Sequence, residues 1–290
     1  MDRRAFSTQA FAAAAALAAG SLAGCRPPQT IAAAADADHA NPMLQFIDEL
    51  ANGDATQRAM ILPTTPRRIG MLVYPGMYPL DLLGPKTIFN DLLNTQVHLV
   101  AATTAPVRAG SGVTVTPDVT YDTCPTGLDV IFVPGGGDGT IAMMRDAATL
   151  RFLQKQAQTA RWVTSVCTGS LVLGAAGLLQ GYRATTHWVT YDVLRTLGAT
   201  PVRERVVEDR NRITSAGVTA GLDLALTLTA RLAGENYAKA EQLNIEYDPD
   251  PPYKAGTPKG AGPRITNAMR RMYGGVVKGA TDAAALAKPD

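Results

Sequence analysis

Cys167 is the residue whose surroundings point most directly to chemistry. Residues 161–166 predict a buried strand, and a run rich in small residues, which predicts a helix, starts at Thr168. Ser165 and Gly169 flank the cysteine two residues to either side. This is the spacing of a nucleophile elbow, in which a strand turns directly into a helix and only small neighbours fit. The partial positive charge of a helix N-terminus favours a thiolate there. The pattern predicts that Cys167 is a nucleophile; the alternative is an inert cysteine buried in the core.

Asp81 is the first candidate partner of that thiol. It follows a predicted strand, residues 69–74, and its neighbours are apolar. A buried carboxyl group tends to stay protonated or to share a proton with a group such as a thiolate. We therefore expect Asp81 to act as an acid near Cys167. Its alternative role is to cap the N-terminus of the following helix.

Consecutive glycines follow another predicted strand, within residues 134–139. Their spacing matches neither a P-loop nor the dinucleotide-binding fingerprint after a first strand. We interpret this segment as a loop whose backbone N–H groups point at a reacting centre. Because the carboxyl ends of parallel strands meet at one edge of a doubly wound sheet, we expect Asp81 and the glycine loop beside Cys167.

The elements that must position these residues appear as apolar runs alternating with stretches of helical spacing. The predicted strands, besides the one before Cys167, are residues 69–74, 97–101 and 128–133. The predicted helices are residues 80–93, 141–160 and 221–232. Residues 107–116, around Gly110-Ser111-Gly112, predict a β-hairpin insertion. This order predicts one α/β domain over residues 67–264, with a doubly wound, mostly parallel sheet and helices on both faces.

The N-terminus predicts an export signal. Arg3 and Arg4 precede an alanine-rich apolar run, so residues 1–24 are interpreted as a twin-arginine signal peptide. Residues 22–25 resemble the lipobox of bacterial lipoproteins, in which the cysteine, here Cys25, carries the lipid. We expect a protein anchored at Cys25 on the periplasmic side or the cell surface, with no other membrane contact. The alternative is a plain cleaved signal.

Two further segments flank the predicted domain. Residues 25–66 are rich in proline and alanine and predict a tether, with one short amphipathic helix at 43–50. Residues 265–290 predict a C-terminal tail.

The composition is that of an ordinary globular protein. Apolar residues make up 46% and charged residues 18% of the 290 residues, which excludes a disordered polyelectrolyte and a coiled coil. The net charge of +2 gives no electrostatic reason to expect a nucleic acid as partner. Three cysteines and three histidines are too few for a disulfide scaffold and a poor basis for a His/Cys zinc site. Cys124 lies in a loop without an elbow, and we expect it to be structural.

Several of these segments together resemble the PfpI/ThiJ superfamily of class I glutamine amidotransferase-like proteins. The segments are residues 166–188, 134–137 and 214–223. Within that superfamily, residues 242–253 and 256–258 resemble the isonitrile (isocyanide) hydratase branch. The similarity covers about residues 68–260. It implies a flavodoxin-like fold and, as is common among its members, a homodimer.

The resemblance also implies roles for individual residues. Cys167 would be the nucleophile, Asp81 the acid near its sulfur, and Thr168 a residue whose N–H and hydroxyl line the site. Gly136 would supply a second backbone N–H. Family proteases have a histidine directly after the cysteine, and Thr168 takes its place here, so that Cys-His pair is absent. His187, 20 residues after Cys167 (187 − 167), is a candidate for the pocket or for packing alone.

The chemistry implied by the resemblance is hydration of an isonitrile to an N-substituted formamide. The thiolate attacks the terminal carbon, Asp81 delivers a proton, and water releases the product. A small-molecule substrate is the expected partner, and neither a metal nor an organic cofactor is required. Asp223, at the end of the matching segment 214–223, is a further pocket candidate.

A binding or sensing module is the competing class, because this type of domain also occurs fused to helix-turn-helix regulators. Only 26 residues follow residue 264 (290 − 264), too few for a DNA-binding domain of two such motifs. A non-enzymatic ligand receptor, a thiol redox sensor, and a glyoxalase-like or amidase-like hydrolase remain open alternatives.

Overall fold

A seven-stranded sheet forms the centre of the protein, for which a computed structural model describes residues 41–287. The strand order is β10-β11-β7-β6-β1-β2-β5. The strands are β1 (Arg67–Leu72), β2 (Thr95–Ala101), β5 (Val119–Thr120), β6 (Val130–Val133), β7 (Trp162–Val166), β10 (Val206–Asp209) and β11 (Arg212–Ser215). Neighbours pair in parallel except β10 and β11, which pair antiparallel at one edge. The predicted doubly wound, mostly parallel sheet is confirmed.

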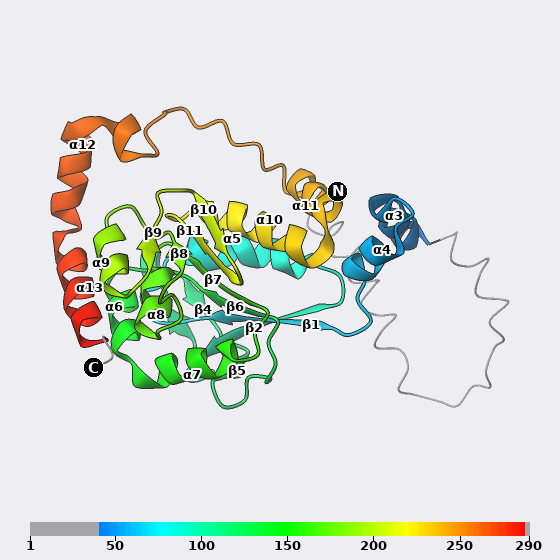
Figure 1. Ribbon diagram of the computed structural model, residues 1–290, viewed down its shortest axis with the longest axis horizontal. Helices are drawn as coiled ribbons and strands as arrows, with labels where there is room; N and C mark the ends of the chain where they lie inside the picture. The colour runs from blue at the N-terminus through cyan, green and yellow to red at the C-terminus, as the bar shows by residue number, and fades with distance from the viewer. Residues whose placement is uncertain (1–40, 288–290) are drawn as a thin grey trace.

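Helices cover both faces of the sheet (Figure 1). The first group, α5 (Pro79–Asn90), α10 (Ala220–Ala233) and α11 (Glu235–Asn244), packs together on one face. The second group, α6 (Asp138–Arg145), α7 (Ala147–Ala157) and α8 (Gly169–Ala175), packs on the other. Strand β6 is buried at every position, as expected for a strand covered on both sides.

The register of the central strands brings their carboxyl ends to one edge. Val133 of β6 pairs with Ser165 of β7, and Ser215 of β11 pairs with Val166 of β7. The segments that follow β1, β6, β7 and β11 therefore start side by side, as is usual for ligand sites in doubly wound sheets.

Two short ladders lie outside the main sheet. Strands β3 (Val107–Arg108) and β4 (Thr114–Val115) pair antiparallel around a 3-10 turn at Gly110–Gly112, which confirms the predicted hairpin. Strands β8 (Arg183–Ala184) and β9 (Thr200–Pro201) pair in parallel, and the short helix α9 (Tyr191–Thr196) lies between them in the chain.

The single helix predicted over residues 141–160 is wrong, because the chain forms α6 and α7 there. Asp146 separates them with an extended backbone (φ −81°, ψ 103°), and its carboxylate accepts a hydrogen bond from the N–H of Thr149 at 2.8 Å. The side chain thereby caps α7, so a local hydrogen bond overrides the helical spacing.

The ends of the described chain pack onto the α/β domain. Helices α3 (Pro42–Ala51) and α4 (Ala55–Ile61) contribute Ile47, Ala51 and Ile61 to the hydrophobic core. The predicted short helix at 43–50 is confirmed, and α4 was not predicted.

Residues after 264 form helical structure instead of the simple tail that the sequence suggested. Helix α12 (Pro258–Met272) is followed by α13 (Gly274–Leu286), which packs against α6 and α9 and buries Ala280, Ala283 and Ala284. The packed unit therefore extends beyond residue 264.

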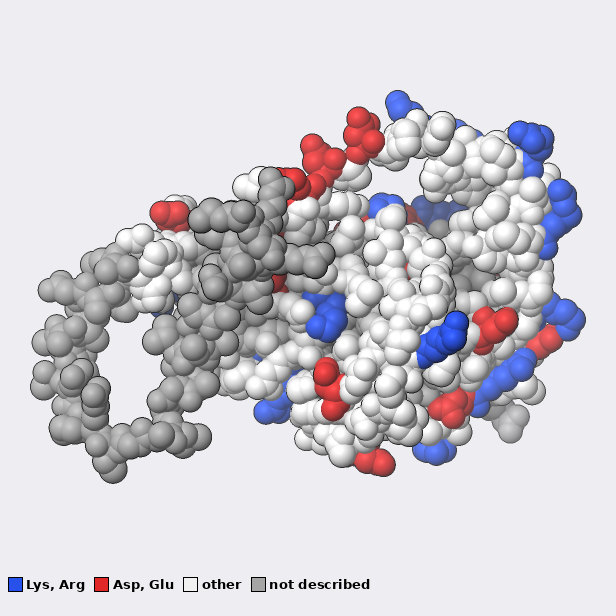
Figure 2. Space-filling view, turned by 180° about the vertical axis from the view of Figure 1, so that it is seen from behind, with Lys and Arg blue, Asp and Glu red and all other residues white. Residues whose placement is uncertain are grey.

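Residues 1–40, which hold Arg3, Arg4 and Cys25, lie outside the described residues. Within residues 41–287, no helix combines the length and the hydropathy needed to cross a bilayer. Figure 2 shows basic and acidic side chains interspersed over the face turned away from the viewer of Figure 1.

Candidate active site

Cys167 lies on a sharp turn between β7, which ends at Val166, and α8, which begins at Gly169. Its backbone has a φ of +56°, in the left-handed region that most residues avoid. A Cβ atom at Gly169 would lie 2.2 Å from the carbonyl oxygen of Val133, so only glycine permits this approach of helix and strand.

Hydrogen bonds from several elements hold the strained cysteine in place. Its N–H is 3.1 Å from the carbonyl oxygens of Ser215, the last residue of β11, and of Ala216, which follows it. Its carbonyl oxygen accepts hydrogen bonds at 3.1 Å from the hydroxyls of Ser170 and Thr186. The position of the thiol is therefore fixed by segments far apart in the sequence.

Asp81 lies in the first turn of α5 and is fully buried. Its Oδ2 accepts a hydrogen bond from the N–H of Gly135 at 3.0 Å. The carboxyl group interacts with the Cys167 side chain. Tyr78 occupies the N-cap position of α5, so the alternative role of Asp81 as a helix cap does not apply.

Burial raises the pKa of the Asp81 carboxyl to about 7, although the hydrogen bonds from Gly135 and Cys167 act in the opposite direction. A carboxyl group with this pKa holds a proton in a substantial fraction of molecules at neutral pH. Asp81 can therefore serve as a general acid next to the thiol.

The pKa of Cys167 is raised by burial and by the charge of an ionised Asp81, and the N–H groups of Val218 and Thr168, which donate to the sulfur, partly oppose this. The sequence suggested a lowered pKa, because a helix starts after the cysteine. The pKa is raised instead, because Cys167 is only 7% exposed and the effect of burial outweighs that of the short helix. When the proton resides on Asp81, the repulsion between thiolate and carboxylate disappears. The two groups thus act as one proton-holding pair.

Thr168 links the turn to the glycine loop. Its Oγ1 accepts a hydrogen bond from the N–H of Gly136 at 2.9 Å and lies 2.7 Å from the carbonyl oxygen of Gly136 and 2.9 Å from Oγ1 of Thr140. The expectation that Gly136 offers a free N–H to the substrate is therefore wrong, because that N–H is bound to Thr168. The N–H of Gly135 is likewise bound to Asp81.

The glycine at position 135 is a steric requirement of this arrangement. A Cβ atom there would lie 2.7 Å from the backbone nitrogen of Thr168 and 2.8 Å from Cβ of Cys167. The loop therefore lies in direct contact with the cysteine turn, as expected for two segments at the same edge of the sheet.

His187 packs against the segment that follows β11. Its Cδ2 would be 2.7 Å from a Cβ atom at Gly217, the residue before Val218. Burial lowers the pKa of His187 to about 4, so the imidazole is neutral at physiological pH. A neutral, half-buried ring beside the site forms part of a wall more readily than it transfers protons.

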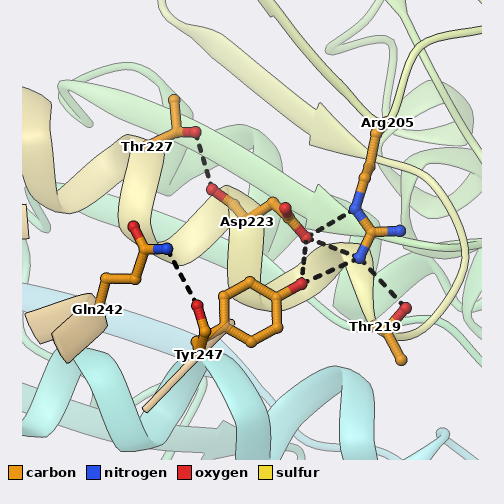
Figure 3. A network of polar contacts seen from close by, with 6 residues as sticks. All are labelled: Arg205, Thr219, Asp223, Thr227, Gln242 and Tyr247. Carbon is orange, nitrogen blue, oxygen red and sulfur yellow. Dashed lines mark hydrogen bonds and ion pairs between the residues drawn. The ribbon is translucent and has the colours of Figure 1, made fainter. Parts of the chain in front are cut away.

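Asp223 does not join the group around the thiol. Figure 3 shows its carboxylate bound by Arg205 and Tyr247, at 2.8 Å from Nε of Arg205 and 3.1 Å from the hydroxyl of Tyr247. Arg205 also donates to Oγ1 of Thr219, at the start of α10. The network ties Arg205 and Tyr247 to α10 through Asp223.

Some residues of the site could not be recognised from the sequence. Val218 has a strained φ of +34° and contributes its N–H to the sulfur, although nothing in its own neighbourhood marks it. Thr186 likewise acts through a contact with a distant segment, whereas Gly135 belongs to the predicted glycine loop and only its partner, Asp81, was not foreseen. Only the rule that ligands bind beyond the carboxyl ends of the strands points to these positions.

The other described thiol lacks such surroundings. Cys124 is buried, and burial alone raises its pKa to about 11. Among residues 41–287, no three histidine, cysteine or acidic residues lie close enough to hold a metal ion.

Residues 67–231 match the model of the DJ-1/PfpI family. The chain is 50% identical to isonitrile hydratase of Pseudomonas putida over 204 residues, which cover 70% of this chain and 89% of the hydratase. It is 32% identical to the transcriptional regulator GbdR of Pseudomonas aeruginosa over 60% of this chain but only 49% of the regulator. A glutathione-independent glyoxalase of Caenorhabditis elegans is 28% identical over 48% of this chain and 74% of the glyoxalase.

The fold is also that of solved structures. A ThiJ/PfpI family protein from Pseudomonas syringae superimposes with a TM-score of 0.75 at 47% identity, covering 77% of this chain and 93% of that protein. Drosophila melanogaster DJ-1beta superimposes with a TM-score of 0.58 at 20% identity, covering 64% of this chain and all of that protein, a likeness of fold alone.

Proposed function

Because this chain belongs to the DJ-1/PfpI family, we propose that its buried thiol and carboxyl group catalyse the hydration of an isonitrile to an N-substituted formamide. The observation that carries the proposal is the fully buried Asp81, with a pKa of about 7, in contact with Cys167. The 50% identity to isonitrile hydratase supports the same reaction.

The reaction needs a nucleophile and an acid at one carbon atom. The thiolate of Cys167 adds to the terminal carbon of the isonitrile, and Asp81 gives its proton to that carbon, which yields a thioimidate. Water then adds to the carbon while the nitrogen takes up a proton. When the tetrahedral adduct collapses, the carbon–sulfur bond breaks, the remaining hydroxyl proton returns to Asp81, and the N-substituted formamide leaves. The sum is one isonitrile and one water to one formamide.

The surroundings of the pair suit this sequence of steps. The N–H groups of Val218 and Thr168 stabilise the sulfur when it carries negative charge, at the start and when it leaves. The hydroxyl of Thr168 holds the glycine loop, and the loop in turn holds Asp81 through Gly135. Thr168 is therefore a positioning residue as well as a backbone donor.

The test is turnover of a panel of isonitriles by the purified protein, with formamide measured by proton NMR. We expect Cys167→Ala to fall to the uncatalysed rate and Asp81→Asn to lose about 10²–10⁴-fold, the usual contribution of a general acid. Because the two groups act as a unit, the double variant should be little worse than Cys167→Ala alone.

Two results would end the hydratase proposal. One is formamide production by Cys167→Ala at the wild-type rate. The other is stoichiometric modification of Cys167 without turnover of any isonitrile, which favours a thiol sensor. Methylglyoxal and simple amides belong in the same panel, since turnover of one of these alone would favour a glyoxalase or amidase on the same site.

A further inference from the structure

Tyr273 is placed where the C-terminal helices reach the active site. It is the residue between α12, which ends at Met272, and α13, which begins at Gly274. Its side chain is partly buried, and its ring centroid lies 5.4 Å from that of His187 at an interplanar angle of 60°. The C-terminal segment therefore supplies an aromatic side chain to a site otherwise built from the strand ends.

One side of Tyr273 adjoins the segments that hold the thiol. His187, its ring partner, follows Thr186, whose hydroxyl donates to the carbonyl oxygen of Cys167. The same His187 ring lies against Gly217, next to Val218 and its N–H to the sulfur.

The other side of the C-terminal segment rests on the glycine loop. Val276 Cγ2 would lie 3.9 Å from a Cβ atom at Gly137, and Ile141 of α6 lies against Gly279 of α13. The segment that begins at Tyr273 thus meets the His187 segment through the Tyr273 ring and the glycine loop through Val276. The sulfur also contributes to the raised pKa of the Tyr273 phenol, after burial and before Tyr78, which is consistent with this proximity.

The surroundings of Tyr273 are mainly aromatic and neutral. His187 is uncharged at physiological pH, and the ring of Trp188 lies 5.9 Å from it. The guanidinium of Arg270 lies 6.0 Å from the Trp188 ring, outside the pair formed by His187 and Tyr273. An apolar substituent is the kind of group that such a wall accommodates.

From this placement we propose that Tyr273 is a specificity-determining residue, the outer wall of the substrate site that limits the size of the group attached to the isonitrile nitrogen. The proposal rests on the hydratase function and adds the substrate class: isonitriles with an apolar, slender substituent. Because Cys167 is only 7% exposed, little room remains beside the sulfur, and the proposal places the substituent of the isonitrile against this wall.

Truncation of the wall should produce a selective gain, which a merely destabilised protein would not show. In Tyr273→Ala we expect kcat/KM for tert-butyl isonitrile, relative to methyl isonitrile, to rise at least about tenfold, the lower end of what one methylene in an apolar pocket discriminates. Tyr273→Phe keeps the ring and should keep the wild-type ratio. Tyr253→Ala removes a tyrosine that is 79% exposed and serves as the matched control.

A second measurement does not depend on hydratase activity. Cys167 is alkylated with iodoacetamide and with its N-tert-butyl derivative, and the labelled peptide is separated from that of Cys124. The rate ratio of the bulky to the small reagent should rise about tenfold in Tyr273→Ala and in Tyr273→Leu, and stay unchanged in Tyr273→Phe and Tyr253→Ala.

The alkylation ratio decides the proposal. An unchanged ratio in both Tyr273→Ala and Tyr273→Leu would overturn the assignment of Tyr273 as the wall, whatever happens to turnover. A shifted ratio in a protein that hydrates no isonitrile would support the wall and refute the hydratase function. Failure of the Tyr273 assignment and failure of the hydratase function therefore give different results.

Discussion

Asp81→Asn should stabilise the protein at alkaline pH while it removes the catalytic acid. The variant keeps the shape of the side chain, and an amide oxygen can still accept the hydrogen bond from the N–H of Gly135. What it removes is the need to bury a charge when the carboxyl group ionises.

The sign and size follow from the two pKa values of Asp81. The carboxyl titrates near ~3.9 in an unfolded chain and at about 7 in the folded protein. Between these two pH values the folded state therefore binds more protons than the unfolded chain. The stability that this difference contributes is fully present below pH ~4 and is lost as the pH rises through 7. The difference between these two pKa values corresponds to about 4 kcal/mol of unfolding free energy, which the wild type loses as the pH rises. Asparagine has no such loss.

The assay is urea unfolding of wild type and Asp81→Asn between pH 4 and pH 8, followed by far-UV circular dichroism. We expect the unfolding free energy of Asp81→Asn, relative to wild type, to rise by about 4 kcal/mol across this range. Asp192→Asn is the matched control, because the Asp192 side chain is 95% exposed and its substitution should give a difference that changes little with pH.

A relative stability that changes by less than about 1 kcal/mol between pH 4 and pH 8 would refute the reasoning. The carboxyl group of Asp81 would then ionise like an exposed one, and its proposed service as a general acid at neutral pH would lose its physical basis.

Three further predictions concern the thiol, its neighbour and the N-terminus. Thr168→Val should cost about 1–3 kcal/mol of unfolding free energy, since it leaves a backbone N–H of the glycine loop without its acceptor; an unchanged urea midpoint would contradict this. In Asp81→Asn, which removes the charge that raises the pKa of Cys167, iodoacetamide should label Cys167 faster than in the wild type at pH 8, while the labelling rate of Cys124 stays unchanged; peptide mapping measures both rates, and an unchanged rate at Cys167 would contradict the assignment. Replacing Arg3 and Arg4 with Lys should block export, measured by cell fractionation, and undiminished export would refute the twin-arginine interpretation.

The sequence by itself determined the sheet, the cysteine turn and the neighbourhood of Asp81. Hydrophobic periodicity is a local property, so residues 69–74, 97–101 and 128–133 predicted buried strands without knowledge of their partners. Parallel strands place their carboxyl ends at one edge, and this rule alone put Asp81 and the glycine loop beside Cys167.

Only the tertiary structure decided the partners and the electrostatics within that neighbourhood. The N–H of Gly136 is bound to Thr168, and Asp223 is bound to Arg205 and Tyr247. The local sequence pattern predicts neither set of partners. Each hydrogen bond depends on which distant segment comes closest when the chain packs.

The same holds for the pKa of the thiol and for the wall of the site. The start of a helix lowers the pKa of a cysteine, but burial by several distant elements and the charge of Asp81 together raise it at Cys167. Tyr273 comes to the site from more than 100 residues away in the chain (273 − 167). The burial of an atom depends on every segment that packs around it. It is therefore determined only when the whole chain has folded.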